Sequence, residues 1–303
     1  MIEYVDKVKM NYSVYSGEDL YTDGDIETEL LDIVKNNTDF DSIIYEKKSW
    51  PVLYHLSDIR ENILSWFPFE KEASVLEIGA GCGAVTGALT DRCKRVVSVD
   101  LSKRRSLINA YRHHEADNLE IIVGNFEDAY KIIDEKFDYI TLIGVFEYSG
   151  LYIHDENAPE SFLKMISKLL KPDGKLIIAI ENRLGLKYFA GCREDHLGKF
   201  FVGIENDYED NGVCTYSKNE LIRIFSNSGY SGWKFYYPYP DYKFPETIYS
   251  DERLPQKGEL YSNIRNFDSD RYVIFDETKA YDGIIEAGLF GEFSNSFLVV
   301  LER

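Results

Sequence analysis

Glycines and one carboxylate gather where the first strongly apolar run of the chain ends. Gly79 and Gly81 follow that run, and Glu77 lies two residues before the first of them. Glycine lets a backbone turn tightly and approach a ligand without a Cβ clash, and a following helix turns its free N–H groups toward that ligand. The spacing Gly79-x-Gly81-x-x-Ala84 also fits a dinucleotide site. A carboxylate at Glu77 suits the ammonium of an amino-acid moiety and repels a pyrophosphate, so the pattern favours a cofactor that carries an amino acid.

Two further polar positions follow the next two apolar runs. Asp100 ends the second run, where its carboxylate can accept hydrogen bonds from both hydroxyls of a ribose. Asn125 and Phe126 follow the third run, where the amide can bond to the exocyclic amine of adenine and the ring can supply an apolar wall. These polar residues and glycines follow one another at successive strand ends: Glu77, the glycines, Asp100 and then Asn125. This order predicts an adenosine-containing cofactor.

Short apolar runs alternate with helical patterns through residues 73–182, and this alternation predicts βαβ units with a parallel sheet. The expected strands are Ser74–Ile78, Arg95–Asp100, Leu119–Val123, Phe137–Ile143 and Lys175–Ile180. Helical patterns at Lys103–His113 and Pro159–Leu170 lie between them. A strand at Trp233–Tyr237 and an apolar run at Ser296–Leu301 are expected to complete the sheet.

The flanking segments are less regular. One helix is expected at Leu56–Trp66 with Ser57 as its N-cap, and another at Ser217–Ser228 with Glu220 completing a capping box. The expected division is a helical lid region at 1–72, a cofactor-binding core at 73–243, an insertion at 244–292 and a final strand at 293–303. The insertion would act as a lid, a substrate element or a homodimer contact.

The segment Val75–Gly83, with Asp100 and Gly124–Asp128 after it, resembles the class I S-adenosylmethionine (SAM)-dependent methyltransferases over about residues 50–240 and the final strand. The resemblance implies an α/β fold with a doubly wound, seven-stranded, mostly parallel sheet whose last strand is antiparallel, between the fifth and sixth strands. It also implies SAM as methyl donor and S-adenosylhomocysteine as product. The implied cofactor contacts are Glu77, Gly79, Ala80, Gly81, Asp100, Leu101, Asn125, Phe126, Glu127, Gly144 and Val145.

A narrower resemblance concerns the acceptor. Segments such as Trp50–Ser57 and Glu181–Gly191 look like parts of methyltransferases associated with bacterial surface-glycan and glycosyltransferase systems. The sequence at 144–148, Gly-Val-Phe-Glu-Tyr, lacks the Asn/Asp-Pro-Pro-Tyr of methyltransferases that act on amines in DNA. The resemblance therefore implies transfer to an O or N atom of a small or glycan acceptor, carbohydrate-like or anionic.

Basic residues gather after the fifth predicted strand of this otherwise acidic chain. The candidate acceptor residues are Glu181, Arg183, Lys187, Arg193, Tyr242 and Lys243. One interpretation is a site for an anionic acceptor such as a sugar phosphate. The alternative is a solvated loop whose charges pair with acidic surroundings.

His196 is the candidate general base for a hydroxyl acceptor, because Asp195 and Glu194 beside it could raise its basicity. The alternative is a histidine that only fixes its loop. His154 stands next to Asp155 and Glu156 but lacks the spacing of a metal-ligand set, so no catalytic metal is expected.

Composition narrows the classes of partner. The chain has 34 basic and 53 acidic residues, and a net charge of −19 repels phosphate backbones, so no nucleic-acid partner is expected. Four widely spaced cysteines and the absence of a bilayer-length apolar run predict a cytoplasmic protein without membrane insertion. Two alternatives remain open: an NAD(P)-dependent oxidoreductase or epimerase, and a non-catalytic SAM-binding module.

Overall fold

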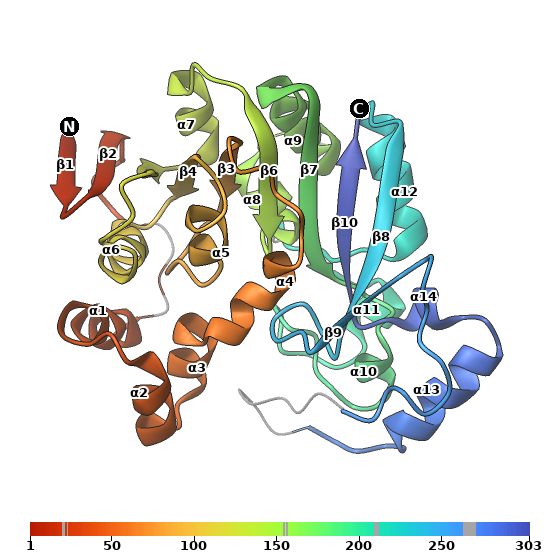
Figure 1. The fold of residues 1–303 in the computed structure, drawn as a ribbon. Helices are drawn as coiled ribbons and strands as arrows, with labels where there is room; N and C mark the ends of the chain where they lie inside the picture. Colours follow the sequence, from red (N-terminus) through yellow and green to blue (C-terminus); the bar gives the residue numbers. More distant parts are fainter. Residues whose placement is uncertain (20–21, 23, 154, 156, 209–211, 263–270) are drawn as a thin grey trace. The chain divides into compact units, whose positions relative to one another are not determined.

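A computed structural model describes residues 1–303 except 20–21, 23, 154, 156, 209–211 and 263–270 (Figure 1). The chain forms two compact units. The first contains Met1–Ile143 and Lys168–Gly174, and the second contains Gly144–Ser167 and Lys175–Arg303. The boundary at Gly144 falls inside the range 73–243 that was expected to form one core.

The strands of the first unit have the order β1-β2-β5-β4-β3-β6. They are β1 (Ile2–Val5), β2 (Val8–Val14), β3 (Ser74–Ile78), β4 (Arg95–Asp100), β5 (Leu119–Gly124) and β6 (Phe137–Ile143). All neighbours from β2 to β6 are parallel, while β1 and β2 form an antiparallel pair. Parallel strands are buried on both faces, which is why β3 to β6 read as nearly continuous apolar runs. The expected bounds of these four strands agree with the structure to within one residue.

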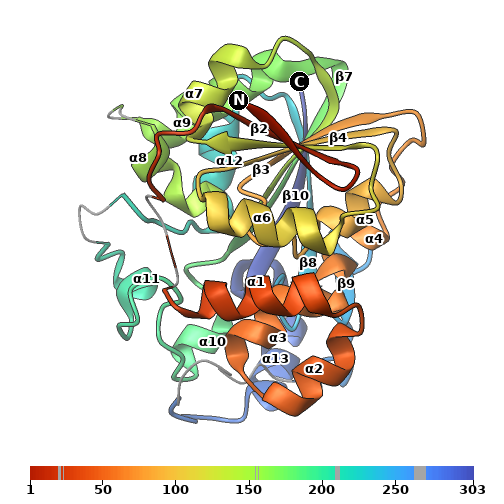
Figure 2. The same cartoon turned by 90° about the vertical axis from the view of Figure 1, so that its left-hand side faces the viewer.

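The helices of the first unit precede and separate these strands. They are α1 (Ile26–Asn36), α2 (Phe40–Lys47), α3 (Trp50–Leu56), the 3-10 turn η1 (Asp58–Glu61), α4 (Asn62–Ser65), α5 (Thr86–Thr90), α6 (Lys103–Arg112) and α7 (Phe126–Ile132). Figure 2 shows α1 lying beside α6. Leu30 of α1 and Leu56 of α3 share a buried apolar cluster with Cys82 and Ile108. The N-terminal helices therefore pack on the glycine loop and on α6.

Two N-terminal expectations were wrong. Residues 1–72 are not wholly helical, because β1 and β2 extend the sheet beside β5. With β9 as a further edge strand beside β8, the sheet exceeds seven strands. The alternating side chains of β2 bury Val8 and Met10. The single helix expected at Leu56–Trp66 is instead the end of α3 followed by η1 and α4, and Ser57 Oγ accepts a hydrogen bond from Ile59 N at the start of η1.

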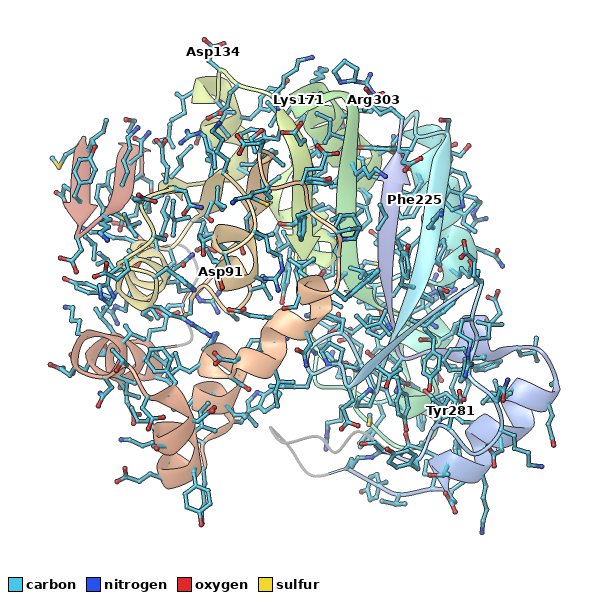
Figure 3. All side chains as sticks on the ribbon, viewed as in Figure 1. Asp91, Asp134, Lys171, Phe225, Tyr281 and Arg303 are labelled. Carbon is cyan, nitrogen blue, oxygen red and sulfur yellow. The ribbon has the colours of Figure 1, made fainter. Side chains whose placement is uncertain are left out.

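The strands of the second unit have the order β7-β10-β8-β9, all antiparallel to their neighbours. They are β7 (Leu170–Glu181), β8 (Gly232–Tyr239), β9 (Thr247–Ser250) and β10 (Ser296–Glu302). The expected antiparallel position of the last strand, between the fifth and sixth strands of the core, is confirmed. Phe225 of α12, labelled in Figure 3, lies beside Trp233 and Phe235 of β8 and helps to bury that side of the strand.

The other elements of the second unit are short helices and loops. They are η2 (Phe146–Tyr148), α8 (Ser149–Tyr152), α9 (Ala158–Leu169), α10 (Leu186–Phe189), α11 (Val202–Glu205), α12 (Lys218–Asn227), α13 (Glu277–Glu286) and α14 (Phe290–Phe293). The capping box at the start of α12 is confirmed, with Glu220 accepting from Ser217 N at 2.8 Å. Within the described residues, no helix is long and apolar enough to cross a membrane.

Candidate functional site

The glycine loop between β3 and α5 has the backbone that its sequence requires. Gly79, Gly81 and Gly83 have φ values of 72°, 54° and 77°, a region that residues with a Cβ rarely adopt. The N–H groups of Gly79 and Ala80 donate to Val99 O of β4 at 2.8 and 3.2 Å. The loop is therefore held at the carboxyl end of β3, where parallel sheets bind their ligands.

Glu77, near the end of β3, is almost completely buried. Its Oε2 accepts hydrogen bonds from Thr86 Oγ1 at 2.8 Å and Ser98 Oγ at 2.6 Å, whereas its Oε1 has no hydrogen-bond partner among the described residues. Burial raises the pKa of the carboxyl to about 7, although the two hydroxyls act in the opposite direction. One buried acceptor atom is thus available to a ligand that brings a donor or a positive charge.

Asp100 closes the loop from the end of β4. Its Oδ2 accepts from Gly81 N at 2.7 Å and its Oδ1 accepts from Ser102 N at 2.9 Å. Burial raises the pKa of Asp100, against the charge of Arg105. Each carboxylate oxygen keeps a further acceptor site, so Asp100 can position the loop and still accept from a ribose hydroxyl.

Asn125 begins α7 after the end of β5. Its Oδ1 accepts from Glu127 N at 3.1 Å and so caps the helix, which leaves the amide N–H groups as its donors to a ligand. The ring of Phe126 is buried and lies near Tyr130. Phe126 therefore contributes first to the core of the first unit.

Gly144 and Val145 are the first residues of the second unit. Gly144 has φ +69°, and its N–H donates to Ala179 O at 2.9 Å. A Cβ at position 144 would lie 2.7 Å from the hydroxyl oxygen of Tyr242. The structure thus brings a predicted cofactor residue and a predicted acceptor residue into direct proximity.

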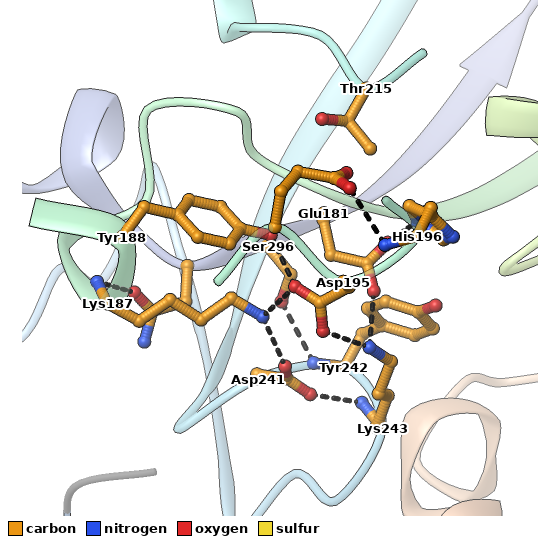
Figure 4. Close-up of polar contacts among 12 residues, drawn as sticks. Glu181, Lys187, Tyr188, Asp195, His196, Thr215, Asp241, Tyr242, Lys243 and Ser296 are labelled. Carbon is orange, nitrogen blue, oxygen red and sulfur yellow. Dashed lines mark hydrogen bonds and ion pairs between the residues drawn. The ribbon is translucent and has the colours of Figure 1, made fainter. Parts of the chain in front are cut away.

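A carboxylate–lysine network occupies the second unit beyond the end of β7 (Figure 4). Its members are Glu181, Lys187, Tyr188, Asp195, Asp241 and Lys243. Lys187 Nζ lies 2.9 Å from Asp195 and 3.2 Å from Asp241, and Lys243 Nζ lies 2.5 Å from Asp195 and 2.6 Å from Glu181. Burial alone would raise the pKa of Asp195, but the two lysines hold it well below its usual range.

A Glu–Glu–His trio adjoins this network and consists of Glu147, Glu181 and His196. His196 Nε2 lies 3.5 Å from Glu181 Oε2 and 4.0 Å from Glu147 Oε1, and its Nδ1 lies 3.0 Å from the hydroxyl of Tyr148. Burial opposes the charged imidazolium, but the interaction with Glu181 raises the pKa of His196 to about 9. Burial, together with the charge of Glu181, raises the pKa of Glu147 to about 8. The trio can therefore hold a proton or another cation.

Of the two carboxylates expected to raise the pKa of His196, Glu194 contributes and also accepts from His196 N, whereas Asp195 has other partners. Asp195 binds Lys187, Lys243 and the hydroxyl of Tyr188, while Glu181 faces the imidazole. Adjacent residues in a loop point in different directions, and sequence proximity did not reveal this. With its pKa raised, His196 is positively charged at neutral pH, so it carries a proton where a base must lack one.

The cations expected to bind an anionic acceptor are already paired. Arg183 Nε lies 2.7 Å from Glu220, and Lys187 and Lys243 lie within the carboxylate–lysine network. Arg193 donates to Gly198 O and stacks on Phe200. Arg183, Lys187 and Lys243 therefore pair with acidic neighbours, as in the alternative interpretation, but Lys187 is buried and not solvated.

Sequence reasoning missed several residues of this region. Glu147 lies three residues after Gly144, and its place after a strand end was the available signal. The contacts of Tyr148 and Asp241 join segments far apart in the chain, and the contact of Tyr188 with Asp195 lies within one irregular loop, so the sequence pattern revealed none of them. His154 and Glu156, considered for a metal, lie outside the described residues.

The fold and the glycine loop together define the class: an α/β protein whose parallel strands end in a glycine loop suited to an adenosine-type cofactor. Residues 76–178 match a family model described as a methyltransferase domain. The chain therefore carries a class I SAM-dependent methyltransferase domain.

Similar proteins agree with this assignment. An uncharacterized methyltransferase of Staphylococcus carnosus is 34% identical over 148 residues, which cover 45% of this chain and 66% of that protein. A ubiquinone biosynthesis O-methyltransferase of Glaesserella parasuis is 33% identical over 120 residues, 38% of this chain and 48% of that protein. The chain thus spans less than two thirds of these relatives. A solved SAM-dependent methyltransferase from Archaeoglobus fulgidus shares the fold, with a TM-score of 0.51, 13% identity and coverage of 86% of this chain and 99% of that one.

Proposed function

We propose that this protein transfers the methyl group of SAM to a hydroxyl oxygen of a small, carbohydrate-like acceptor. The observation that carries the first half of the proposal is the unpartnered, buried Oε1 of Glu77 next to the left-handed glycines of the loop. An ammonium group fits that oxygen, and the glycines leave room for a ligand to approach the backbone. The loop residues therefore fit the amino-acid part of SAM.

Most of the other proposed cofactor contacts lie in the same unit, whereas Gly144 and Val145 begin the second unit. Glu77, Gly79, Ala80 and Gly81 would hold the methionine part, and Asp100 with Leu101 the ribose. Asn125, Phe126 and Glu127 would border the adenine, while Gly144 and Val145 would border the sulfonium. SAM supplies an activated methyl group, and transfer leaves S-adenosylhomocysteine.

The acceptor half of the proposal rests on the second unit. Because Lys187 and Lys243 are neutralised by carboxylates, a neutral hydroxyl compound suits this region better than an anion. Tyr242 beside Gly144 would position the acceptor. The O-methyltransferase of Glaesserella parasuis supports oxygen as the accepting atom. The segments that resemble glycan-associated methyltransferases, Glu181–Gly191 among them, support a carbohydrate-like compound.

Calorimetric titration with SAM, S-adenosylhomocysteine, NAD and NADP tests the cofactor. We expect binding of SAM and S-adenosylhomocysteine but not of NAD or NADP. Asp100→Ala should weaken SAM binding at least about tenfold, because the hydrogen bonds to the ribose and to Gly81 N are lost. Asp138→Ala is the matched control, since Asp138 also accepts from a backbone N–H, that of Ser74 at the start of β3. Binding of NAD without measurable binding of SAM would instead establish the oxidoreductase alternative.

The acceptor is tested with SAM that carries a radioactive methyl group. Incubation with sugars, nucleotide sugars and glycan fragments should give labelled, alkali-stable methyl ethers. Labelled amines would show that nitrogen accepts the methyl group. SAM binding without transfer to any compound of a broad metabolite extract would support a non-catalytic SAM-binding module.

A further inference from the structure

The Glu–Glu–His trio brings three metal-ligating side chains together from separate segments. Glu147 comes from η2, Glu181 from the end of β7, and His196 from the loop after α10. One ligand atom of each lies within 4.8 Å of the other two. We propose that Glu147, Glu181 and His196 bind one divalent transition-metal ion, Mn²⁺ or Zn²⁺.

Unpartnered buried atoms point to a missing ligand. The side chains of Glu147 and His196 are only 1% and 9% exposed. Glu147 Oε2 nevertheless has no hydrogen-bond partner among the described residues, and His196 Nε2 has only the longer ion-pair contacts of 3.5 Å to Glu181 and 4.0 Å to Glu147. A buried polar atom without a partner is costly and rare, and an ion between these groups would satisfy both.

The charges of the surroundings favour a cation. The carboxylates are Glu147, Glu181, Glu194, Asp195 and Asp241, and the ammonium groups are Lys187 and Lys243. The negative groups remain in excess even when His196 is protonated. Burial of uncompensated carboxylates is strongly unfavourable, so a divalent ion would relieve the repulsion between Glu147 and Glu181.

Neighbouring side chains hold His196 and Glu181 so that Nε2 of the imidazole and Oε2 of the carboxylate face each other, where a metal ion could bind. Tyr148 bonds Nδ1 of His196 at 3.0 Å, which fixes the ring and leaves Nε2 toward the two carboxylates. Lys243 binds Oε1 of Glu181 at 2.6 Å and leaves Oε2 on the side of His196. Metal-ligating histidines and carboxylates commonly have such hydrogen-bonded supports.

The ligand types and distances restrict the metal. An imidazole with two carboxylates suits Mn²⁺ or Zn²⁺ better than Mg²⁺ or Ca²⁺, which prefer oxygen alone. Ligands at ~2.1 Å from a tetrahedral Zn²⁺ stand about 3.4 Å apart, close to the 3.5 Å between Nε2 and Oε2. Three protein ligands leave a coordination position open for water or a neutral acceptor oxygen. That catalytic use rests on the proposed function, whereas binding of the ion does not.

Metal analysis of the full chain tests the site. Protein stripped with a chelator is titrated with Mn²⁺, followed by its paramagnetic resonance, and with Zn²⁺, Mg²⁺ and Ca²⁺ by calorimetry. We expect one tight Mn²⁺ or Zn²⁺ per chain and a higher Tm with the ion. Glu147→Gln and His196→Asn should each weaken binding at least tenfold. Glu135→Gln, which removes a carboxylate that pairs with Arg95 in the first unit, is the matched control and should bind as the wild type does.

Two results would overturn the proposal: a wild-type chain that takes up no ion, or trio variants that bind as tightly as the control. The Tm shift of the wild-type chain is independent of whether the variants fold. A parallel SAM titration separates this proposal from the proposed function. SAM binding without metal refutes the metal site alone, and metal binding without SAM refutes the cofactor assignment alone.

Discussion

Burial of the Glu77 carboxylate lowers the stability of the folded protein, and the same group is proposed to bind SAM. Its carboxyl has a pKa near 7 in the folded chain, above the ordinary value of 4.5, because it is buried. A raised carboxyl pKa means that the folded state holds the proton more tightly. Folding stability is therefore lost as pH rises from about 4.5 through about 7, by up to about 3 kcal/mol.

Glu77→Gln should consequently stabilise the cofactor-free protein, with a gain that grows between pH 5 and pH 8. Its amide oxygen can still accept from Thr86 and Ser98. The same change should weaken SAM binding about tenfold or more, since a neutral amide attracts an ammonium group less. Urea unfolding at both pH values and calorimetry measure the two effects. Glu72→Gln, an exposed ion-pair partner of Lys94, should change neither, and a pH-independent gain would contradict the argument.

Individual residues of the candidate site were predictable from the sequence where they lie at or directly after the end of a strand. Asp100 ends β4 and Asn125 directly follows β5, so the position of each follows from the pattern of the sheet. The partners of His196 were not predictable, because Glu147 and Glu181 reach it only through folding of the loop after α10. Carboxylates in such a loop look the same in sequence whether they bind a lysine, as Asp195 does, or accept from backbone N–H groups, as Glu194 does.

At the scale of elements, predictability depended on burial. Strands β3 to β6 are buried on both faces and gave nearly continuous apolar runs, whereas β2 gave only alternation. The break between α3 and η1 was hidden, because Ile59, Ile63 and Leu64 keep a helical spacing although Ile59 is exposed. Short helices such as α10 and α11 lack the length that makes a period visible.

Strand β2 should contribute measurably to the stability of the first unit. Met10 is fully buried on one face of the strand, and Ser13 is exposed. We expect Met10→Ala to lower the free energy of unfolding by about 2–5 kcal/mol through the cavity it leaves. Ser13→Ala should stay within about 0.5 kcal/mol of the wild type. Equal effects of the two changes in urea unfolding would show that β2 is not docked on β5.

The charge of the whole molecule predicts its response to salt. At a net charge of −19 the excess acidic side chains repel one another and destabilise the folded chain. The Debye length of this repulsion falls from about 30 Å at 0.01 M salt to about 8 Å at 0.15 M. We expect the Tm to rise with sodium chloride over this range at pH 7.5. Near pH 5, close to the isoelectric point of about 4.7, the same salt should have little effect. An equal shift at both pH values would point to specific ion binding.

The same charge argues that RNA is not the methyl acceptor. Nucleic-acid binding needs a basic surface that releases counterions, and non-specific complexes have Kd values of about 10⁻⁴ to 10⁻⁶ M. The cations nearest the trio, Lys187 and Lys243, are already held by carboxylates. We expect no saturable binding of a labelled single-stranded RNA at low salt, where electrostatic attraction is strongest. Methyl label from SAM should appear in the small-molecule fraction of a cell extract and not in its RNA. Label in RNA would mean that a basic surface forms despite the overall charge, and the carbohydrate-like acceptor would have to be abandoned.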